Sequence, residues 1–222
     1  MSRIVLKLGG SVAAASAAQA LELADAGNDV VVVHGAGPQI NAELRRRGIG
    51  VEFVNGRRVT DPATLAVVRA SLVAVGAEVS AALGPAALPL VGDEIGLHAR
   101  RVPELGEVGD PLPCRPAAIE VALAAGLIPV VAPIAVGPLN VNADEAAAAL
   151  AVGLHADRIV FVSDVPGVYL EGSVARRIDA VQAEGLLDAG AFEGGIVPKL
   201  LAAVRAARLG VRAEIGETAV VA

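Results

Sequence analysis

The stretch Ile4-Val5-Leu6-Lys7-Leu8-Gly9-Gly10 has the pattern of a short apolar strand that runs into a glycine turn. A second apolar run, residues 30–33, ends in a similar way at His34-Gly35-Ala36-Gly37. Two more buried strands are expected at residues 128–132 and 158–162, and alanine-rich helices are expected between the strands. Because strand and helix alternate along the chain, the sequence predicts an α/β fold: a three-layer α/β/α sandwich around a mostly parallel sheet.

Two hairpins are expected beside the main sheet. Asn55-Gly56 lies between β-prone runs at residues 51–54 and 58–60, and Asn-Gly is a strong hairpin signal. Residues 97–109 predict a second, more polar hairpin. Asn142 and Glu145 together resemble a capping box before an alanine-rich helix, so Glu145 is interpreted as a cap only.

Composition limits the class of protein. Of the 222 residues, 55% are hydrophobic and 2% aromatic, so Val, Leu, Ile and Ala must build the core, as in a buried parallel sheet. This length suits one domain, or two lobes that share one sheet. The net charge is -6 and no basic stripe is visible, which disfavours nucleic-acid binding. Cys114 is the single cysteine, which excludes an intramolecular disulfide framework and fits a reducing cytoplasm.

No membrane span is expected. Residues 121–141 carry no charge and are numerous enough to imitate one. Prolines and glycines interrupt this stretch, so it is interpreted as a helix end, a buried strand and a loop.

The motifs that can carry chemistry follow strand ends. In an open α/β sheet the ligand site lies at the carboxyl ends of the strands. Glycines there let backbone N–H groups approach a phosphate, although a glycine pair also makes an ordinary tight turn. Two glycine-rich strand ends that lead into helices favour anion binding. A Walker A sequence and a complete dinucleotide fingerprint are both missing from the sequence, which disfavours a P-loop protein and a nicotinamide oxidoreductase.

The two lysines carry the most information. Lysine and arginine together number 18, yet only Lys7 and Lys199 are lysines. Lys7 adjoins the first glycine turn, and Lys199 follows Gly194-Gly195 at a predicted helix start. A lysine is a compact point charge that can neutralise an oxygen of a transferred phosphoryl group.

Three further polar residues have open interpretations. Asp144 stands at a helix start, where it either complements the helix dipole or orients the two lysines. Arg57 and Arg58 follow the Asn-Gly turn, where an arginine either remains solvated or clamps a carboxylate. His34 is interpreted as a structural residue and not as a base.

Taken together, these motifs resemble the amino-acid kinase family, and within it the acetylglutamate kinases. The resemblance runs from Ile4 to nearly the last residue. It rests on Lys7-Leu8-Gly9-Gly10, His34-Gly35-Ala36-Gly37-Pro38-Gln39, residues 53–61, residues 105–109, Asn140-Val141-Asn142-Ala143-Asp144, Ser163-Asp164-Val165-Pro166-Gly167 and residues 194–199. It implies the carbamate kinase-like fold, with an acceptor-binding and dimerisation lobe at about residues 1–150 and a nucleotide-binding lobe at residues 151–222.

The resemblance also implies a role for each matched residue. Lys7 and Lys199 would neutralise the phosphates, and Asp144 would fix both lysines. Backbone N–H groups for the phosphates would come from Gly9, Gly10, Gly35 and Ala36. The acylated amino acid would bind Arg58 and Asn140, beside Ala36 and Gly37. The nucleotide side would be lined by Ser163, Asp164 and Gly167, and magnesium would be held by ATP oxygens with no protein metal site.

The implied reaction is ATP-dependent phosphorylation of the side-chain carboxylate of N-acetyl-L-glutamate, in arginine biosynthesis. A carboxylate needs no general base, so the chain must supply positioning and positive charge. Carrier-bound aminoadipate as acceptor, or a non-catalytic amino-acid or nucleotide sensor, are the alternatives. Relatives carry Gly where this chain has Ala36, and its methyl is expected to crowd the phosphate path. The first strand begins almost at once, so a homodimer without arginine feedback is expected.

Overall fold

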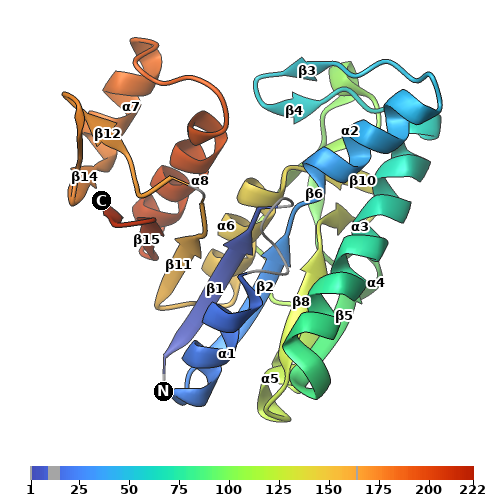
Figure 1. Cartoon of the computed structure of the whole chain (residues 1–222), viewed down its shortest axis with the longest axis horizontal. Coiled ribbons are helices and arrows are strands. Elements are labelled where there is room, and N and C mark those ends of the chain that lie inside the picture. The colour runs from blue at the N-terminus through green and yellow to red at the C-terminus, as the bar shows by residue number, and fades with distance from the viewer. Residues whose placement is uncertain (1, 10–15, 164) are drawn as a thin grey trace.

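The computed structural model describes residues 2–9, 16–163 and 165–222. Within these residues the chain folds around one central sheet with helices on both faces (Figure 1). The predictions for Gly10 and Asp164 lie outside the described residues.

The central sheet is mostly parallel, as the sequence predicts. In the described part of the chain its eight strands follow the order β14 (Arg177–Asp179), β16 (Thr218–Val221), β15 (Arg212–Ile215), β11 (Arg158–Phe161), β1 (Arg3–Leu8), β2 (Asp29–His34), β8 (Ile128–Ala132) and β5 (Ala87–Val91). Strands β15 to β5 run parallel, β16 is antiparallel to β15, and β14 runs parallel to β16. The chain first adds β2, β5 and β8 on one side of β1 and then crosses to add β11 on the other side. The carboxyl end of β1 therefore lies at a topological switch point, where such sheets bind ligands.

The helices form the two outer layers. On one face lie α1 (Ala17–Asp25), α2 (Gly37–Arg46) and α3 (Pro62–Leu83). The other face carries α5 (Ala117–Ala124), α6 (Ala143–Gly153), α7 (Ala180–Asp188) and α8 (Ile196–Arg208), and the one-turn helix α4 (Gly92–Ile95) after β5 packs Ile95 against the cluster of this second face. Each layer shares a hydrophobic cluster with its face of the sheet, built almost wholly from aliphatic residues. The three-layer α/β/α prediction is confirmed.

Side-chain alternation along β1 explains the position of Lys7. Ile4, Leu6 and Leu8 are buried in the cluster under α1 and α3, while Val5 is buried in the cluster on the α6 side. Because successive strand residues point to opposite faces, Lys7 shares the face of Val5 and meets the start of α6.

A smaller sheet stands beside the carboxyl ends of the main strands. It contains β6 (Ala99–Arg101), β7 (Val108–Pro111), β10 (Leu139–Val141) and β9 (Ile134–Ala135), and the pairing of β6 with β7 confirms the polar hairpin. The prediction that Asn140 lies in a loop after β8 is wrong, because Asn140 lies within β10. Short helical turns occupy Gly84–Ala86 and Pro103–Leu105.

The Asn-Gly hairpin forms as predicted, with shorter strands. β3 (Phe53–Val54) pairs with β4 (Arg57–Arg58), and φ is 49° at Asn55 and 76° at Gly56. A two-residue hairpin turn of type I′ requires a positive φ at both central residues, and Asn55 and Gly56 meet this requirement. A third hairpin, β12 (Tyr169–Leu170) with β13 (Ser173–Val174), was not predicted.

Helix α3 is long and strongly apolar. Together with the following turn, Pro62–Ala86, it is long and apolar enough to cross a membrane by length and composition alone, and 33% of its most apolar window is buried in the fold. One such helix is weak support for a membrane span, because a helix that packs on a core passes the same test. Residues 121–141, by contrast, form the end of α5, β8, β9 and β10. The expected helix end and buried strand are confirmed, whereas the expected loop contains two short strands.

Candidate active site

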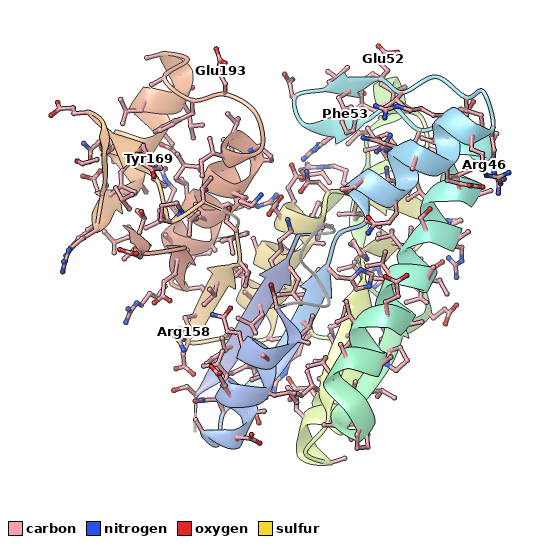
Figure 2. All side chains as sticks on the ribbon, viewed as in Figure 1. Arg46, Glu52, Phe53, Arg158, Tyr169 and Glu193 are labelled. Carbon is pink, nitrogen blue, oxygen red and sulfur yellow. The ribbon has the colours of Figure 1, made fainter. Side chains whose placement is uncertain are left out.

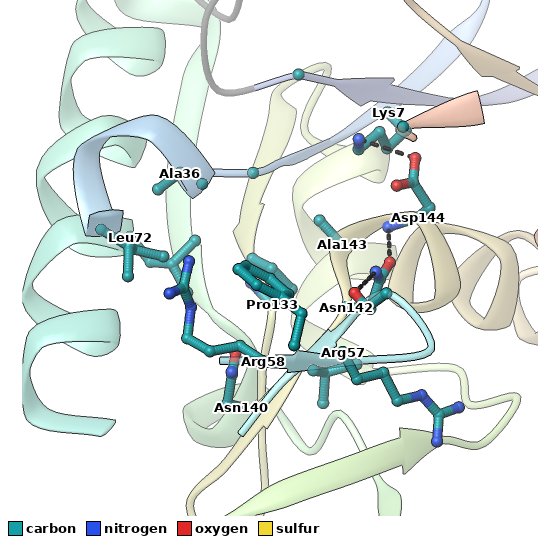
Figure 3. A pocket seen from close by; sticks show the side chains of 18 of the residues that line it. Lys7, Ala36, Arg57, Arg58, Leu72, Pro133, Asn140, Asn142, Ala143 and Asp144 are labelled. Carbon is teal, nitrogen blue, oxygen red and sulfur yellow. Dashed lines mark hydrogen bonds and ion pairs between the residues drawn. The ribbon is translucent and has the colours of Figure 1, made fainter. Parts of the chain in front are cut away.

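A cavity of about 450 Å³ opens at the carboxyl ends of β1 and β2 (Figure 3). The β3–β4 hairpin, the strand β10 and the starts of α2, α6 and α8 all contribute to its wall. It brings together most of the predicted site residues: Lys7, Gly9, Gly35, Ala36, Gly37, Arg58, Asn140, Asp144 and Lys199.

An ion pair lies in the wall of the cavity. The Nζ atom of Lys7 is 2.8 Å from Oδ1 of Asp144, and the two side chains are 7% and 8% exposed. Asn142 caps α6, because its Oδ1 accepts hydrogen bonds from the backbone N–H groups of Asp144 and Glu145. Asp144 is thus held in the first turn of a capped helix, and it fixes the ammonium group of Lys7 at the cavity.

Three helices begin at this cavity. Gly37 and Pro38 of α2, Ala143 and Asp144 of α6, and Gly195 before α8 all line it. The amino end of a helix carries partial positive charge and N–H groups without intrahelical partners. These ends therefore add to the two lysines, and the combination favours a ligand with several negative charges.

Some groups of the glycine loop after β2 already make contacts within the fold. The N–H of Gly35 donates to the carbonyl oxygen of Leu8 at 3.0 Å, so this group already has an acceptor. Ala36 precedes the first turn of α2 with φ of -143°, which alanine adopts without strain, and it is 2% exposed within a hydrophobic cluster. Its methyl group is thus packed as a core residue.

The guanidinium of Arg58 is held in place and has a donor available for an anion. Its side chain stacks over the Phe53 ring, with 4.6 Å between the guanidinium carbon and the ring centroid, and its Nη2 donates to Oδ1 of Asn41 at 2.6 Å. Nη1 is buried and has no hydrogen-bond partner among the described residues. Burial lowers the pKa of Arg58 from its ordinary value, yet a guanidinium remains charged in proteins. A buried cation with an unused donor fits a carboxylate.

Thr60 connects Asn140 to the hairpin. The Asn140 side chain donates to Oγ1 of Thr60 at 2.9 Å, and the Thr60 hydroxyl donates to the Arg58 carbonyl at 2.7 Å. Thr60 is fully buried. The sequence alone predicts no role for Asn41, Phe53 or Thr60. The only signal is that Phe53 and Thr60 stand close to Arg58 in the motif at residues 53–61.

Arg57 does not share the environment of Arg58. Its guanidinium binds Glu145, with Nε 3.0 Å from Oε1, and also Asp110, with Nη2 2.9 Å from Oδ1. Figure 3 shows the Arg57 side chain pointing away from Arg58. The interpretation of Glu145 as a cap only is therefore wrong, since its carboxylate is an ion-pair partner of Arg57. Burial is the largest influence on this carboxyl group, and it raises the pKa of Glu145.

The predicted nucleotide side is described in part. Lys199 lines the cavity, and its Nζ donates to the Gly195 carbonyl at 3.3 Å. Val162 lies between the end of β11 and Ser163, and its backbone N–H donates to the Lys7 carbonyl oxygen. Ser163 therefore lies beside the end of β1. Gly167 is buried, and a Cβ there would lie 2.5 Å from Oγ1 of Thr218. Gly167 thus permits close packing of this loop on the end of the sheet.

Two chemical features of the site bear on mechanism. Within residues 2–9, 16–163 and 165–222, no group of three or more His, Cys, Asp and Glu side chains is arranged to hold a metal ion. His34 is fully buried, and burial lowers its pKa from 6.5 to about 4. The imidazole of His34 is therefore neutral at pH 7 and is packed against α3, as the structural interpretation predicts.

Known proteins with a similar sequence point to one family. The profile described as "Amino acid kinase family" matches residues 2–216. The acetylglutamate kinase of Saccharopolyspora erythraea is 42% identical over 84% of this chain and 68% of its own length. The enzymes of the same name from Frankia casuarinae and Thermus thermophilus are 40% and 39% identical, and the alignments cover 94% and 93% of this chain and 64% and 87% of those proteins. The chain thus spans about two thirds of the first two relatives.

Solved structures agree with the fold. The protein smu.665 from Streptococcus mutans superposes with a TM-score of 0.89 at 30% identity, over 99% of this chain and 98% of that one. A carbamate kinase from Giardia, at 16% identity and a TM-score of 0.74, shares the fold over 99% of this chain and 98% of its own. Because the family profile matches this chain across nearly its whole length, the chain belongs to the amino acid kinase family.

Proposed function

We propose that this protein transfers the terminal phosphoryl group of ATP to the side-chain carboxylate of N-acetyl-L-glutamate, a step of arginine biosynthesis. One observation carries the proposal: the buried Lys7–Asp144 pair and the buried, incompletely satisfied Arg58 share one cavity with three helix amino ends. The acetylglutamate kinases among its relatives support the choice of acceptor.

The acceptor side is assigned to Arg58 and Asn140. The free Nη1 of Arg58 would donate to the α-carboxylate, while Phe53 and Asn41 keep its guanidinium in place. Asn140 would bind the acylated amino group beside Ala36 and Gly37. The reacting carboxylate is already an anion at pH 7 and needs no proton removed. The protein's task is to hold two mutually repelling anions within reach of one another.

The nucleotide side is assigned to Lys7, Lys199 and the helix amino ends. ATP supplies the phosphoryl group, and its phosphates would also carry Mg²⁺. Lys7, oriented by Asp144, would bind non-bridging oxygens from the acceptor-lobe side, and Lys199 would do so from α8. In this proposal residues 1–150 form the acceptor lobe and residues 151–222 the nucleotide lobe, with Gly9, Gly10, Ser163, Asp164 and Gly167 beside the phosphates.

A coupled chemical trap tests the proposal. The protein is incubated with MgATP, hydroxylamine and N-acetyl-L-glutamate, and the acyl phosphate is detected as a hydroxamate. Free glutamate and aspartate serve as alternative acceptors and should give little hydroxamate. Product from carrier-bound aminoadipate alone would transfer the assignment to lysine biosynthesis, and a failure with every carboxylate, despite nucleotide binding, would favour a sensor.

We further propose that the chain functions as a cytoplasmic homodimer joined through α3. The outer face of α3 exposes Ala63, Ala66, Ala70, Ala74 and Ala77, and Val73 is 47% exposed. A mostly apolar hollow adjoins this face; Pro62, Leu65, Ala66, Ile134 and Pro138 line it together with Arg69 and Glu107. An apolar helix face of this length is a favourable contact for its own copy.

Light scattering on a size-exclusion column tests the dimer. Val73→Arg should give a monomer, because a charge cannot be buried in a self-complementary apolar contact. Val121→Arg on α5 is the control, since Val121 is 70% exposed and lies on the opposite layer. A dimer that survives Val73→Arg, or equal behaviour of the two variants, would refute the α3 contact.

A further inference from the structure

Asp110 is the centre of an ion network that connects the two proposed lobes. Its Oδ1 accepts from Nη2 of Arg57 at 2.9 Å and from Nη1 of Arg205 at 3.1 Å. Its Oδ2 accepts from Nη2 of Arg100 at 3.2 Å. Asp110, on β7, is 19% exposed, and Arg205 also donates to the Pro111 carbonyl at 3.2 Å. Arg205 is thus held at two points, unlike an ordinary surface ion pair.

The partners of Asp110 come from different parts of the site. Arg57 lies on the hairpin that carries Arg58, and Arg57 also binds Glu145, the residue after Asp144. Arg205 lies on α8, the helix that carries Lys199. A line of contacts therefore runs from the acceptor hairpin and the Lys7–Asp144 pair to the helix of the second lysine.

The turn of the hairpin also lies close to the start of α8. A Cβ built on Gly56 would lie 3.5 Å from Cβ of Pro198, the residue before Lys199. Helices α6 and α8 also pack on each other, and most of the residues that these two helices contribute to their shared hydrophobic cluster are alanines. Two helix faces made of alanine interdigitate less than two faces made of long side chains, so they restrain the shift of α8 along α6 less strongly. The ion pairs at the cavity end can then fix the position of α8 along its own axis.

We propose that Asp110 and Arg205 are positioning residues, which hold α8 so that Lys199 stands at the working distance from Lys7. This inference rests on the proposed phosphoryl transfer and assigns Asp110 and Arg205 a part in it without contact with either reactant. A displacement of a catalytic group by about 1 Å can lower a rate on the order of 10²-fold. Loss of Asp110 or Arg205 should therefore affect turnover more than the affinity for the acceptor.

The chain offers a matched control. Arg205→Met removes a guanidinium that reaches Asp110 from α8, and Arg100→Met removes one that reaches the same carboxylate from β6, the neighbour of β7 in the small sheet. We expect Arg205→Met to lower kcat by roughly 10-fold or more, with less than about a 3-fold change in KM for N-acetylglutamate. Arg100→Met should leave both constants within about 2-fold, as is usual for an exposed pair. Arg205→Lys should recover only part of the loss, because a lysine cannot make the same two-point contact.

A distance measurement tests the same inference without catalysis. Spin labels are placed at Glu52, beside the hairpin, and at Glu193, ahead of α8, in a Cys114→Ser background; both glutamates are exposed and lie on the two sides of the molecule's upper rim (Figure 2). Arg205→Met should broaden or shift the label-to-label distance distribution, and Arg100→Met should not. Thermal melting checks that every variant is folded.

The outcomes separate the two proposals. If the unmodified protein makes no hydroxamate but Arg205→Met changes the distance distribution, the positioning inference stands and the proposed function fails. If hydroxamate forms and Arg205→Met matches Arg100→Met in kcat and in distances, the positioning inference is overturned and the function stands.

Discussion

Acidification should destabilise this fold through His34. His34 is fully buried at the end of β2, and burial lowers its pKa from 6.5 to about 4. A contact with the backbone of Gly35 opposes this effect in part. Between these two pH values the unfolded chain binds a proton at His34 and the folded chain does not.

The sign and size of the change in the free energy of unfolding follow from that difference in protonation. Because the unfolded state binds the extra proton, stability is complete above pH 6.5 and falls as the pH drops toward 4. Each pH unit in this interval costs about 1.4 kcal/mol, so the loss approaches about 3 kcal/mol near pH 4. That is a large part of the roughly 5–15 kcal/mol that stabilises a typical domain.

Guanidinium unfolding at pH 7.5, 6.5, 5.5 and 4.5, followed by circular dichroism, measures the effect. The comparison is with His34→Leu, which has nothing to protonate at this position, and with His98→Gln, which changes an exposed histidine. Glu43, whose pKa is lowered to about 2 by its bonds to Arg46 and Arg47, loses its contribution only below about pH 4.5, and it does so equally in all three proteins.

The difference between the unmodified protein and His34→Leu should therefore grow as the pH falls from 6.5 to 4.5. His98→Gln should follow the unmodified protein. If His34→Leu shows the same pH dependence as the unmodified protein, His34 titrates normally in the folded state, and the reasoning from burial is wrong.

Three further changes have defined outcomes. Lys199→Ala should lower kcat on the order of 10²–10³-fold, because a fixed cation would then be missing where charge develops; a loss of only a few-fold would place Lys199 outside the site. Arg58→Met should raise KM for the acceptor roughly 10–100-fold, since a hydrogen bond to a charged group is worth about 1.5–3 kcal/mol, and an equal rise in KM for ATP would contradict this assignment. Gly153→Ala would place a Cβ 2.0 Å from the Cys114 carbonyl oxygen, so calorimetry should show a loss of about 1–3 kcal/mol or more, whereas Gly185→Ala, with no atom within 4 Å of the new Cβ, should be neutral or slightly stabilising.

Local patterns were sufficient for the frame of the fold. The apolar run that contains Lys7, the glycine turn after His34 and the Asn55-Gly56 hairpin each depend on neighbours in sequence, and each formed where expected. The strand alternation that places Lys7 on the α6 face is also a local property. These signals fixed the sheet edge at which the cavity opens.

The errors concern contacts between distant residues. Arg57 and Glu145 are 88 positions apart, and the capping-box pattern around Asn142 gave a satisfactory local explanation of Glu145 that concealed the ion pair. Asn140 was assigned to a loop because three residues are too few to show strand periodicity, and β10 exists only because β7 and β9 pair with it. The short strands of residues 169–179 and helix α7 have equally weak local patterns.

The central position of β1 has a consequence for biosynthesis of the chain. One edge of β1 pairs with β2, where Ile4 faces Val30, but its other edge must wait for β11, where Ile4 faces Arg158. At the usual speed of translation that wait lasts roughly 8–30 s, during which the N–H and C=O groups along one edge of an apolar strand have no partner strand. Rapid overexpression should therefore favour aggregation, and slower translation or nascent-chain chaperones should raise the yield of folded protein.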